Sequence, residues 1–404
     1  NVRWKTEVRG ATWDDVKASW TVELSSGETI EARAVISAVG QLNRPFVPEI
    51  PGRFDGPSFH TARWDHSVDL TGKRVVMIGA GATGFQVAPA IAEKVGHLTV
   101  IQRSAQWMFP NPNYHAAVGP GMKWALRHLP FYGRWYRFLL FWPGCDKGLA
   151  AAKVDPAWEP QQRSVSEAND FARMMFTEWI KSQLEDRPDL IDKVVPDYPA
   201  TGKRTLQDNG SWLATLKRPN VDLVRGGVAR LESDGVVDSH GVKHFADVVV
   251  FATGFRANDL LLPMKITGRG GADLRAHWGT RPRAYLGMTV PGFPNFFMLY
   301  GPSTNLASGG SLIFHSECQV RYVTQCLQLL AERHAAAMEP RPERYDDWYA
   351  RTQAEMRTMV WASPHIEHSF YKNADGEVNG LSPWRLVDYW SWTRTVNAED
   401  YAWR

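Results

Sequence analysis

The sequence predicts an α/β protein of two domains, in which one domain is inserted into the chain of the other. A length of 404 residues exceeds what one ordinary hydrophobic core accommodates. Near the middle of the chain, GKRVVMIGAGATGFQVAPAIAE (72–93) predicts a buried strand, a glycine-rich turn and a helix. Two similar strands flank this segment, ARAVISAVG (32–40) and HFADVVVFATGF (244–255), and both end in a small residue and glycine. We therefore expect the chain to cross between two domains after each of these strands.

Composition and charge exclude several classes of protein. An apolar content of 44% excludes a disordered chain, and the net charge of +3 forms no concentrated basic stripe of the kind that binds nucleic acid. The three cysteines, Cys145, Cys318 and Cys326, form no CxxC pair, which indicates neither a metal site nor a disulfide framework and favours a cytoplasmic location. Apolar runs such as FLLFW (138–142) are too short to span a membrane.

The opening segment, residues 4–40, predicts three strands, with turn signals at Trp13-Asp14-Asp15 and at Ser26-Gly27. This segment resembles the middle of a domain more than its start. We therefore expect that the chain lacks an N-terminal portion of this domain.

The loop FDGPSFHTARWD (54–65) carries a His and a Trp-Asp pair just ahead of the central strand. Taken alone, a Trp in a connecting loop usually caps a core, and a lone His is usually a hydrogen-bonded polar group. The function of this loop therefore depends on its surroundings.

The glycine-rich turn has GxGxxG spacing in the context that a dinucleotide site requires, between a strand and a helix. Gly79 permits the tight turn, Gly81 lets the backbone approach a pyrophosphate, and Gly84 lets helix and strand pack closely. Ala82 and Thr83 open the helix, whose N-terminus favours phosphates. The alternative is a turn without a ligand.

The next strand, residues 97–102, ends in Arg103-Ser104. An NAD site usually has an acidic residue at this place to hold the ribose 2′-hydroxyl, whereas Arg binds a 2′-phosphate. Arg103 therefore favours NADPH over NADH. The alternative is a solvated strand end.

The loop at 54–65 resembles the fingerprint FxGxxxHxxxW of type I Baeyer–Villiger monooxygenases, which Pro or Asp follows. Five residues match: Phe54, Gly56, His60, Trp64 and Asp65. Flavin monooxygenases that oxidise nitrogen or sulfur share the His but usually lack the Trp. The resemblance continues through VGQLNRPFVPEIPG (39–52), FATGF (251–255) with Thr253 and Gly254, DYPATGKRTLQDNGSWLATLKRPNVDLV (197–224) and GFPNFFMLYGPST (292–304). The segment FYKNADGEVNGLSPW (370–384) resembles the branch that oxidises aryl ketones such as 4-hydroxyacetophenone.

The resemblance implies two Rossmann-like domains, with an NADPH domain inserted into an FAD domain. It implies the following bounds: residues 1–64 for the remainder of the FAD domain and a linker, 65–120 and 198–254 for the NADPH domain, 121–197 for a helical insertion, and 255–404 for the C-terminal part of the FAD domain. A structure with Val35 and Val249 in separate sheets far from each other would contradict this arrangement. His60 and Trp64 would couple hinge motion to cofactor position; the alternative is that they only staple two domains together.

The implied reaction uses NADPH and FAD. Hydride from NADPH reduces FAD, O₂ forms a flavin C4a-peroxide, and this attacks a ketone to give an ester or lactone. Arg204 would hold the peroxide, Lys203 would contact the nicotinamide nucleotide, and Asp208 would orient this pair. The simpler interpretation of Lys203-Arg204 is a solvated turn. Two other functions stay open: oxidation of nitrogen or sulfur, and a non-catalytic remnant that binds NADP without flavin.

Two departures from the family and one segment without a motif qualify this interpretation. The family's FAD domain begins with its own GxGxxG, whereas the GxGxxG of this chain lies in its middle. The family usually has Trp where this chain has Phe370, and Phe cannot donate a hydrogen bond. WALRHLPFYGRWYRFLLFW (124–142) mixes apolar and basic residues, and Pro130 and Pro143 break its helical pattern. We expect it to cover the substrate tunnel. The alternative is a membrane-surface helix, because three arginines lie beside its aromatic residues: Arg127, Arg134 and Arg137.

Overall fold

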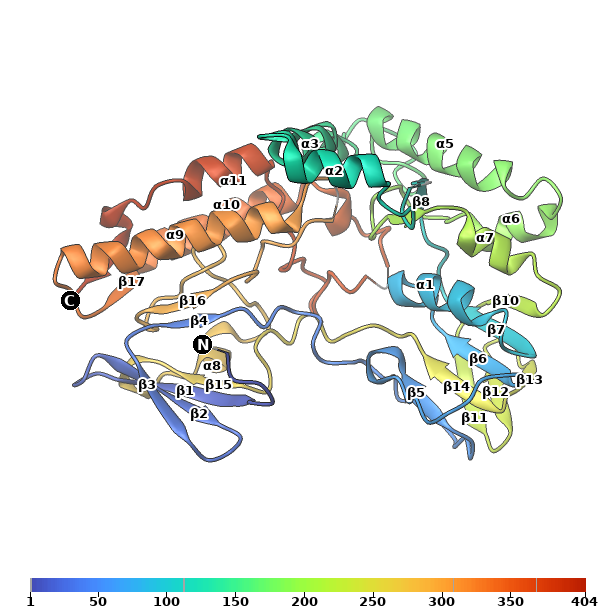
Figure 1. Cartoon of the computed structure of the whole chain (residues 1–404), viewed down its shortest axis with the longest axis horizontal. Helices are drawn as coiled ribbons and strands as arrows, with labels where there is room; N and C mark the ends of the chain where they lie inside the picture. Colours follow the sequence, from blue (N-terminus) through green and yellow to red (C-terminus); the bar gives the residue numbers. More distant parts are fainter. Residues whose placement is uncertain (1, 112, 308, 368) are drawn as a thin grey trace. The chain divides into compact units, whose positions relative to one another are not determined.

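The computed structural model describes residues 2–111, 113–307, 309–367 and 369–404. The chain forms two compact units (Figure 1). Unit 1 contains the chain up to residue 43, residues 137–153 and residues 257–404, and unit 2 contains residues 44–136 and 154–256. Two of the passages between the units, at 43/44 and at 256/257, follow closely on the two strands that end in glycine.

Unit 2 is built on a five-stranded parallel sheet with the order β10-β7-β6-β14-β5. Its strands are β5 (Ser58–His60), β6 (Arg74–Ile78), β7 (His97–Gln102), β10 (Val221–Arg225) and β14 (Val248–Phe251). The central strands are nearly continuous runs of buried apolar residues, as expected of a parallel sheet that is covered on both faces.

Helices cover one face of this sheet, and a small antiparallel sheet covers the other. Val75 and Met77 of β6 point into a core that they share with α1 (Ala82–Ile91), α5 (Glu167–Ser182) and α7 (Ser211–Leu216). The alternate residues Val76 and Ile78 join a second core. That core includes residues of β12 from a three-stranded sheet: β11 (Val228–Glu232), β12 (Gly235–Asp238) and β13 (Lys243–Phe245).

Several short helices and one pair of short strands complete unit 2. They are η1 (Thr61–Arg63), α2 (Pro120–His128), η3 (Pro188–Leu190), α6 (Ile191–Val194) and the parallel pair β8 (Met108–Pro110) and β9 (Leu206–Asp208). Helix α3 (Tyr132–Phe141) begins in unit 2 and ends in unit 1.

Unit 1 contains a four-stranded sheet with the order β15-β1-β2-β3 and a parallel pair, β4 and β16. The strands are β1 (Val8–Asp14), β2 (Ser19–Leu24), β3 (Thr29–Ala32), β15 (Lys265–Thr267), β4 (Val35–Ser37) and β16 (Phe296–Met298). The third strand expected from residues 4–40 is therefore divided into β3 and β4, which pair in different sheets.

The remaining elements of unit 1 are mainly helical. They are η2 (Trp142–Gly144), α4 (Lys147–Ala150), η4 (Arg269–Gly271), α8 (Leu274–Trp278), α9 (Leu312–Glu332), α10 (Pro342–Met356), η5 (Val360–Ala362), α11 (Leu386–Thr393), η6 (Ala398–Asp400) and the antiparallel pair β17 (Met338–Pro340) and β18 (Tyr401–Trp403). Its cores contain several buried aromatic residues. Trp20 packs edge-on against Trp13, with their ring centroids 5.5 Å apart, and its indole N–H donates to the Pro294 carbonyl at 2.8 Å.

The division of the chain differs from the expected one in three respects. Residues 44–64 belong to unit 2 and not to unit 1, because β5 pairs with β14. The segment 121–197 is not one insertion, because residues 137–153 belong to unit 1. Val35 and Val249 lie in separate sheets, one with β16 and the other with β5 and β6.

Within the described residues, no helix combines the length and apolar character needed to cross a bilayer. The same residues contain no group of three or more His, Cys, Asp or Glu side chains that could hold a metal ion.

Candidate functional site

The predicted segments gather at the carboxyl edge of the sheet in unit 2. The strands are parallel, so their carboxyl ends meet at one edge, which is where open α/β sheets bind ligands. The glycine turn follows β6, Arg103 follows β7, Thr253-Gly254 follows β14, and His60 ends β5. Four segments that are far apart in the sequence therefore reach the same edge.

The three glycines of the turn have different surroundings. A Cβ on Gly79, whose φ is +106°, would lie 2.5 Å from the Ala252 carbonyl oxygen, and a Cβ on Gly84 would overlap the carbonyl oxygen of Gly79. A Cβ on Gly81 would meet no atom within 4 Å. Two glycines are therefore required by packing, whereas the third leaves open space beside the backbone.

Helix α1 begins directly after Gly81 with Ala82 and Thr83, and no side chain caps its N-terminus. The first N–H groups of a helix have no partner within the helix, and they attract anions. The open space at Gly81 and this uncapped N-terminus together fit a dinucleotide pyrophosphate.

Two cationic side chains lie at the end of β7. Arg103 is exposed, and its guanidinium forms no hydrogen bond or ion pair with the described part of the chain. The Lys203 ammonium donates to the Ser104 hydroxyl at 3.3 Å and lies 4.5 Å from the centroid of the Tyr198 ring. Tyr198 is buried, which raises its pKa well above the usual range and keeps it neutral. The Lys203-Arg204 segment is thereby anchored beside Arg103.

Arg204 is exposed, and its side chain makes no hydrogen bond or ion pair within the described ranges of the chain. The next residues, Leu206 to Asp208, form β9 and pair with β8. Arg204 thus stands on a segment that is held at both ends, and its permanent charge is available to a ligand.

Asp208 does not contact Lys203 or Arg204 through any described hydrogen bond or ion pair. Its carboxylate is fully buried, and its Oδ2 accepts from the Trp179 indole N–H at 3.1 Å and from the Gln183 amide at 3.4 Å. Its Oδ1 is buried without a hydrogen-bond partner among the described residues. Asp208 therefore ties β9 to the end of α5. Sequence reasoning missed Trp179 and Gln183, because the only signal was their helical i,i+4 spacing.

The fingerprint residues lie entirely within unit 2. The Phe54 ring folds over Gly56, where a Cβ would lie 2.6 Å from the ring and 3.0 Å from the Asp247 carbonyl oxygen. Trp64 is half-buried and packs edge-on against Phe59, with their ring centroids 5.0 Å apart. Asp65 is exposed and accepts from the backbone N–H and the hydroxyl of Ser67, so it serves its own turn.

His60 is buried at the end of β5. Its Nδ1 accepts the backbone N–H of Ala62 at 3.0 Å, so the neutral ring carries its proton on Nε2. The ring packs edge-on against Phe255, with their centroids 5.8 Å apart. Burial lowers the pKa of His60, and the backbone of Gly254 partly opposes this shift.

The two chain segments beside His60 form a short antiparallel ladder. The N–H of Phe46 donates to the Gly254 carbonyl at 2.8 Å, and the N–H of Arg256 donates to the Arg44 carbonyl at 2.9 Å. The Thr253 hydroxyl donates to the carbonyl of Phe46. These segments lie next to the passages at 43/44 and 256/257, so His60 supports the place where the chain enters and leaves unit 2.

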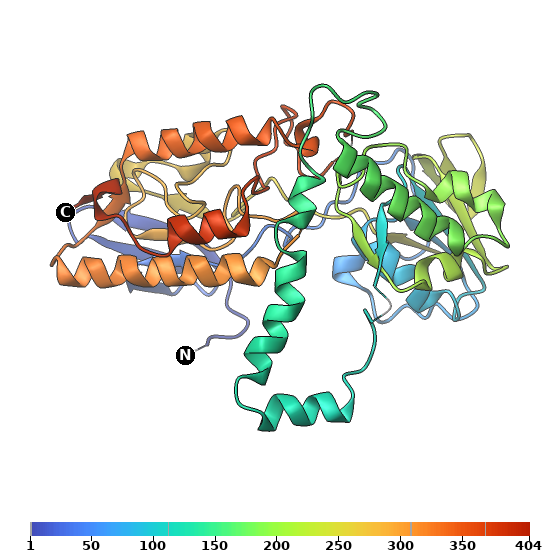
Figure 2. The same cartoon turned by 90° about the horizontal axis from the view of Figure 1, so that it is seen from above.

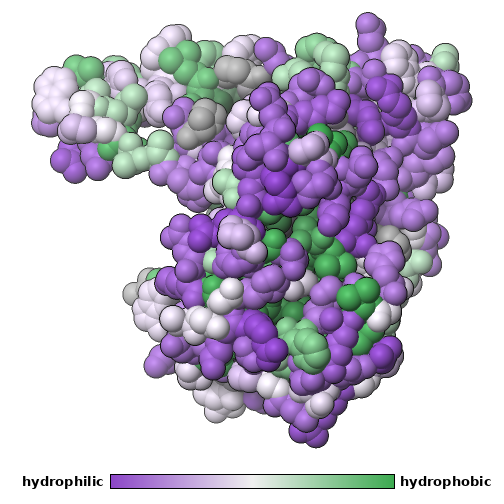
Figure 3. Space-filling model, turned by 90° about the vertical axis from the view of Figure 1, so that its right-hand side faces the viewer, coloured by the Kyte–Doolittle hydropathy of each residue, from purple (hydrophilic) through white to green (hydrophobic). Residues whose placement is uncertain are grey.

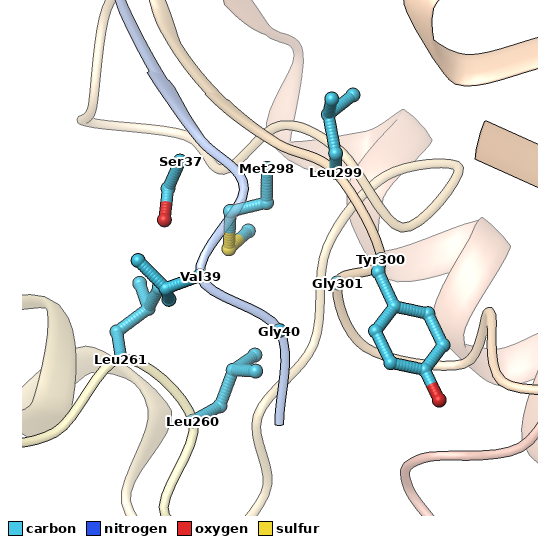
Figure 4. A pocket seen from close by; sticks show the side chains of 9 residues that line it. All are labelled: Ser37, Val39, Gly40, Leu260, Leu261, Met298, Leu299, Tyr300 and Gly301. Atoms are coloured by element: carbon cyan, nitrogen blue, oxygen red, sulfur yellow. The ribbon is translucent and has the colours of Figure 1, made fainter. Parts of the chain in front are cut away.

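Unit 1 has a small hollow at the carboxyl ends of β4 and β16, with a volume of about 180 Å³ (Figure 4). It is lined by Ser37, Val39, Gly40, Leu260, Leu261, Met298, Leu299, Tyr300 and Gly301. Tyr300 has a φ of +57°, a strained conformation that often occurs at ligand sites, and its hydroxyl accepts from the Gln41 amide at 2.9 Å. The hollow is lined mainly by apolar side chains and by the backbone of two glycines, Gly40 and Gly301.

Phe370 lies in unit 1 and is 40% exposed, and its ring centroid is 4.2 Å from that of Tyr371. Its backbone carbonyl accepts from the Asn258 amide at 3.4 Å. The exposed ring offers an apolar surface and no donor.

Comparisons with known proteins agree with this arrangement. The family model described as pyridine nucleotide-disulphide oxidoreductase matches residues 1–132. An uncharacterized monooxygenase, y4iD of Sinorhizobium fredii, is 40% identical over 99% of this chain, which spans only 61% of that relative. A Baeyer–Villiger monooxygenase of Streptomyces coelicolor is 33% identical over 99% of this chain and 74% of its own length. The structure of an oxidized steroid monooxygenase bound to NADP superposes with a TM-score of 0.80 at 29% identity, over 99% of this chain and 80% of that one.

Proposed function

Because the chain belongs to the family of Baeyer–Villiger-type flavin monooxygenases, we propose that the whole protein uses NADPH, FAD and O₂ to convert a ketone into an ester or lactone. Unit 2 is the NADPH domain in this proposal, and unit 1 belongs to the FAD domain. The observation that carries it is the contact between Lys203 and Ser104. This contact brings the Lys203-Arg204 pair to the sheet edge that also carries the glycine turn.

The residues of unit 2 suit NADPH. The backbone around Gly81 and the first turn of α1 would hold the pyrophosphate, and Arg103 would hold the 2′-phosphate of the adenosine ribose. Lys203 would contact the nicotinamide nucleotide at the end of β7, beside Arg103. Each of these groups supplies positive charge or N–H donors to an anionic ligand.

Arg204 would act on the reacting oxygen. When bound, the flavin supplies the reduction of O₂ and the transfer of one oxygen atom to the substrate. Arg204 contributes a planar set of donors and a charge that no ordinary pH removes. Such a group stabilises negative charge where it develops in the reaction. Asp208 acts at a distance, because it fixes β9 to α5 and so limits the movement of the segment that carries Arg204.

In this proposal unit 1 contributes to the FAD site, and the substrate is an aryl ketone. The hollow at the carboxyl ends of β4 and β16 would lie against part of the cofactor. The segment 370–384 resembles the branch that oxidises aryl ketones, so we propose an aryl ketone as substrate. Trp64 in the fingerprint favours ketone oxidation over the oxidation of nitrogen or sulfur.

The absorbance spectrum of the purified protein is the first test. A yellow protein with flavin absorbance that oxidises NADPH and forms phenyl esters from aryl ketones would support the proposal. A colourless protein that still binds NADPH would contradict it and would indicate a nucleotide-binding remnant. Conversion of a thioether to a sulfoxide, with no ester formed from any ketone, would assign the protein to sulfur oxidation instead.

A further inference from the structure

The segment around α2 and the start of α3 exposes an unusual number of large apolar side chains. Neither helix contains a buried residue within its described part. The exposed apolar residues are Trp124, Leu126, Leu129, Phe131 and Trp135. We call these residues, together with the exposed cations among them, the α2–α3 surface; both helices are drawn in teal in Figure 2. The face drawn in Figure 3 is mostly hydrophilic, with hydrophobic residues gathered near its centre and over the part that projects at the upper left.

The charge of this surface has one sign. The cations Lys123, Arg127 and Arg134 are exposed, and no Asp or Glu occurs from Lys94 to Cys145. The Arg134 guanidinium lies 5.8 Å from the centroid of the Phe131 ring. Cations and aromatic rings therefore alternate over the same short stretch, and none of these three cations forms an ion pair within the part of the chain that the structure describes.

Phe131 lies in the turn between the two helices and is 75% exposed. Its φ is +58°, a conformation that bulky residues rarely adopt and that glycine adopts freely. A residue chosen for folding alone would be small and polar at such a position. The strained backbone instead holds an aromatic ring in water beside the Arg134 guanidinium, so most of its surface is open to an apolar partner.

We propose that the α2–α3 surface binds the headgroup region of an anionic lipid bilayer. Short helices with aromatic and leucine side chains and several Lys or Arg residues lie in this region, with the rings between headgroups and acyl chains and the cations on lipid phosphates. The helices have nine and ten residues, so attachment occurs at the surface and not across the bilayer. A second copy of the chain fits less well, because it would place like charges face to face.

This inference does not depend on the proposed function and has its own test. Purified protein is sedimented with vesicles of phosphatidylcholine alone and with vesicles that also contain phosphatidylglycerol. We expect binding to the anionic vesicles, little binding to the neutral ones, and release by added salt.

Two variants and one control make the test specific. Phe131→Gly removes the ring and suits the backbone, so it should fold at least as well and bind roughly tenfold more weakly. Arg127→Gln combined with Arg134→Gln should weaken binding to the anionic vesicles about 30-fold and leave binding to the neutral vesicles unchanged. Trp4→Ser, which removes an aromatic ring that is 83% exposed in unit 1, should bind like the unmodified protein.

Three results would overturn the proposal. The first is no binding to anionic vesicles at low salt. The second is binding that both the glycine variant and the glutamine variant leave intact. The third is a dimer in sedimentation velocity that Phe131→Gly dissociates, in a protein that binds no vesicles, which would assign the surface to a second copy of the chain.

Discussion

Arg103 is exposed at the end of β7 without a partner among the described residues, so its charge is available to a nucleotide phosphate. Arg103→Ala should therefore weaken NADPH binding by about 1.5–3 kcal/mol, the range for hydrogen bonds to charged groups, which is roughly 10- to 150-fold in affinity. NADH lacks the 2′-phosphate, so its affinity should change little. The measurement is the dissociation constant of each nucleotide by fluorescence titration.

Lys94→Ala is the matched control, because Lys94 is exposed near the start of β6, at the opposite edge of the sheet. It should leave both affinities unchanged. Equal losses of NADPH and NADH affinity in Arg103→Ala would show that Arg103 does not read the 2′-phosphate.

Arg204 should be required for oxygen transfer and not for cofactor binding. In the flavin-loaded protein, Arg204→Ala should keep FAD and NADPH but release hydrogen peroxide in place of ester, because nothing then stabilises the charge on the reacting oxygen. Arg204→Lys should rescue poorly, since a single ammonium lacks the planar donor set. The ratio of ester to hydrogen peroxide per NADPH consumed measures this. An unchanged ratio in Arg204→Ala would make Arg204 an ordinary surface residue.

Single residues were predictable where local geometry permits only one residue type. Gly79 and Gly84 could be assigned from spacing alone, because a side chain at either would collide with backbone. The partners of Asp208 could not, because Trp179 and Gln183 are 29 and 25 residues away in sequence and approach it only after α5 packs. The expected link between Asp208 and the Lys203-Arg204 pair relied on the family's spacing, whereas in this structure the Asp208 side chain is buried and bonds to α5.

At the scale of one element, two glycines of the turn before α1 have different functions: Gly84 is needed for stability and Gly81 for nucleotide binding. Gly81→Ala meets open space at an ordinary φ of −69°, so the melting temperature should stay constant while NADPH affinity falls, because the methyl group occupies the approach of the pyrophosphate. Gly84→Ala pushes α1 away from Gly79 and should cost about 1–3 kcal/mol of stability. Thermal unfolding and nucleotide titration of both variants provide the measurement. A loss of stability in Gly81→Ala equal to that in Gly84→Ala would contradict this division.

Helix α9 carries a histidine that should make unit 1 sensitive to acid. His315 is buried, its Nδ1–H donates to the Thr304 carbonyl at 2.9 Å, and burial lowers its pKa to about 4. An unfolded His titrates near ~6.5, so the unfolded chain takes up the proton first as the pH falls. The stabilising contribution is therefore complete above about pH 6.5 and is lost progressively down to pH 4, by about 3 kcal/mol in all.

His315→Gln should flatten the dependence of stability on pH over this range, measured by urea unfolding at several pH values. His365→Gln, which replaces an exposed histidine, should keep the slope of the unmodified protein. A slope that is equally steep in His315→Gln would assign the acid sensitivity to other groups.

Elements with a strong periodic pattern were predictable, and short ones were not. The strands β6, β7 and β14 follow from continuous runs of Val and Ile bounded by glycine or charged residues. Strand β5 has three residues and no such pattern, and it exists because its backbone pairs with β14. This pairing moves the fingerprint loop from the expected linker into unit 2.

At the scale of the whole molecule, the passages after residues 32–40 and 244–255 could be inferred because both strands end in glycine, which permits the φ of +68° at Gly40 and of +82° at Gly254. The return of residues 137–153 to unit 1 could not, because it depends on contacts with distant segments. Two of these are the ion pair of Arg137 with Glu317 and the packing of Phe141 on Phe314, with ring centroids 5.1 Å apart. Neither contact has a signature in the local sequence.

The two units should also differ in their response to nucleotide. Each of the four hydrophobic clusters described for this chain lies within one unit, so each unit has a core that can unfold on its own. NADP⁺ should bind only folded unit 2. A nucleotide concentration of about 100 times the dissociation constant should then stabilise that unit by ~2.7 kcal/mol and leave unit 1 unchanged. Calorimetry should show two unfolding transitions. NADP⁺ should raise the midpoint temperature of one of them, and Gly81→Ala should abolish this shift. A single transition that moves as a whole would show that the units unfold together, which would mean that contacts outside these clusters couple them.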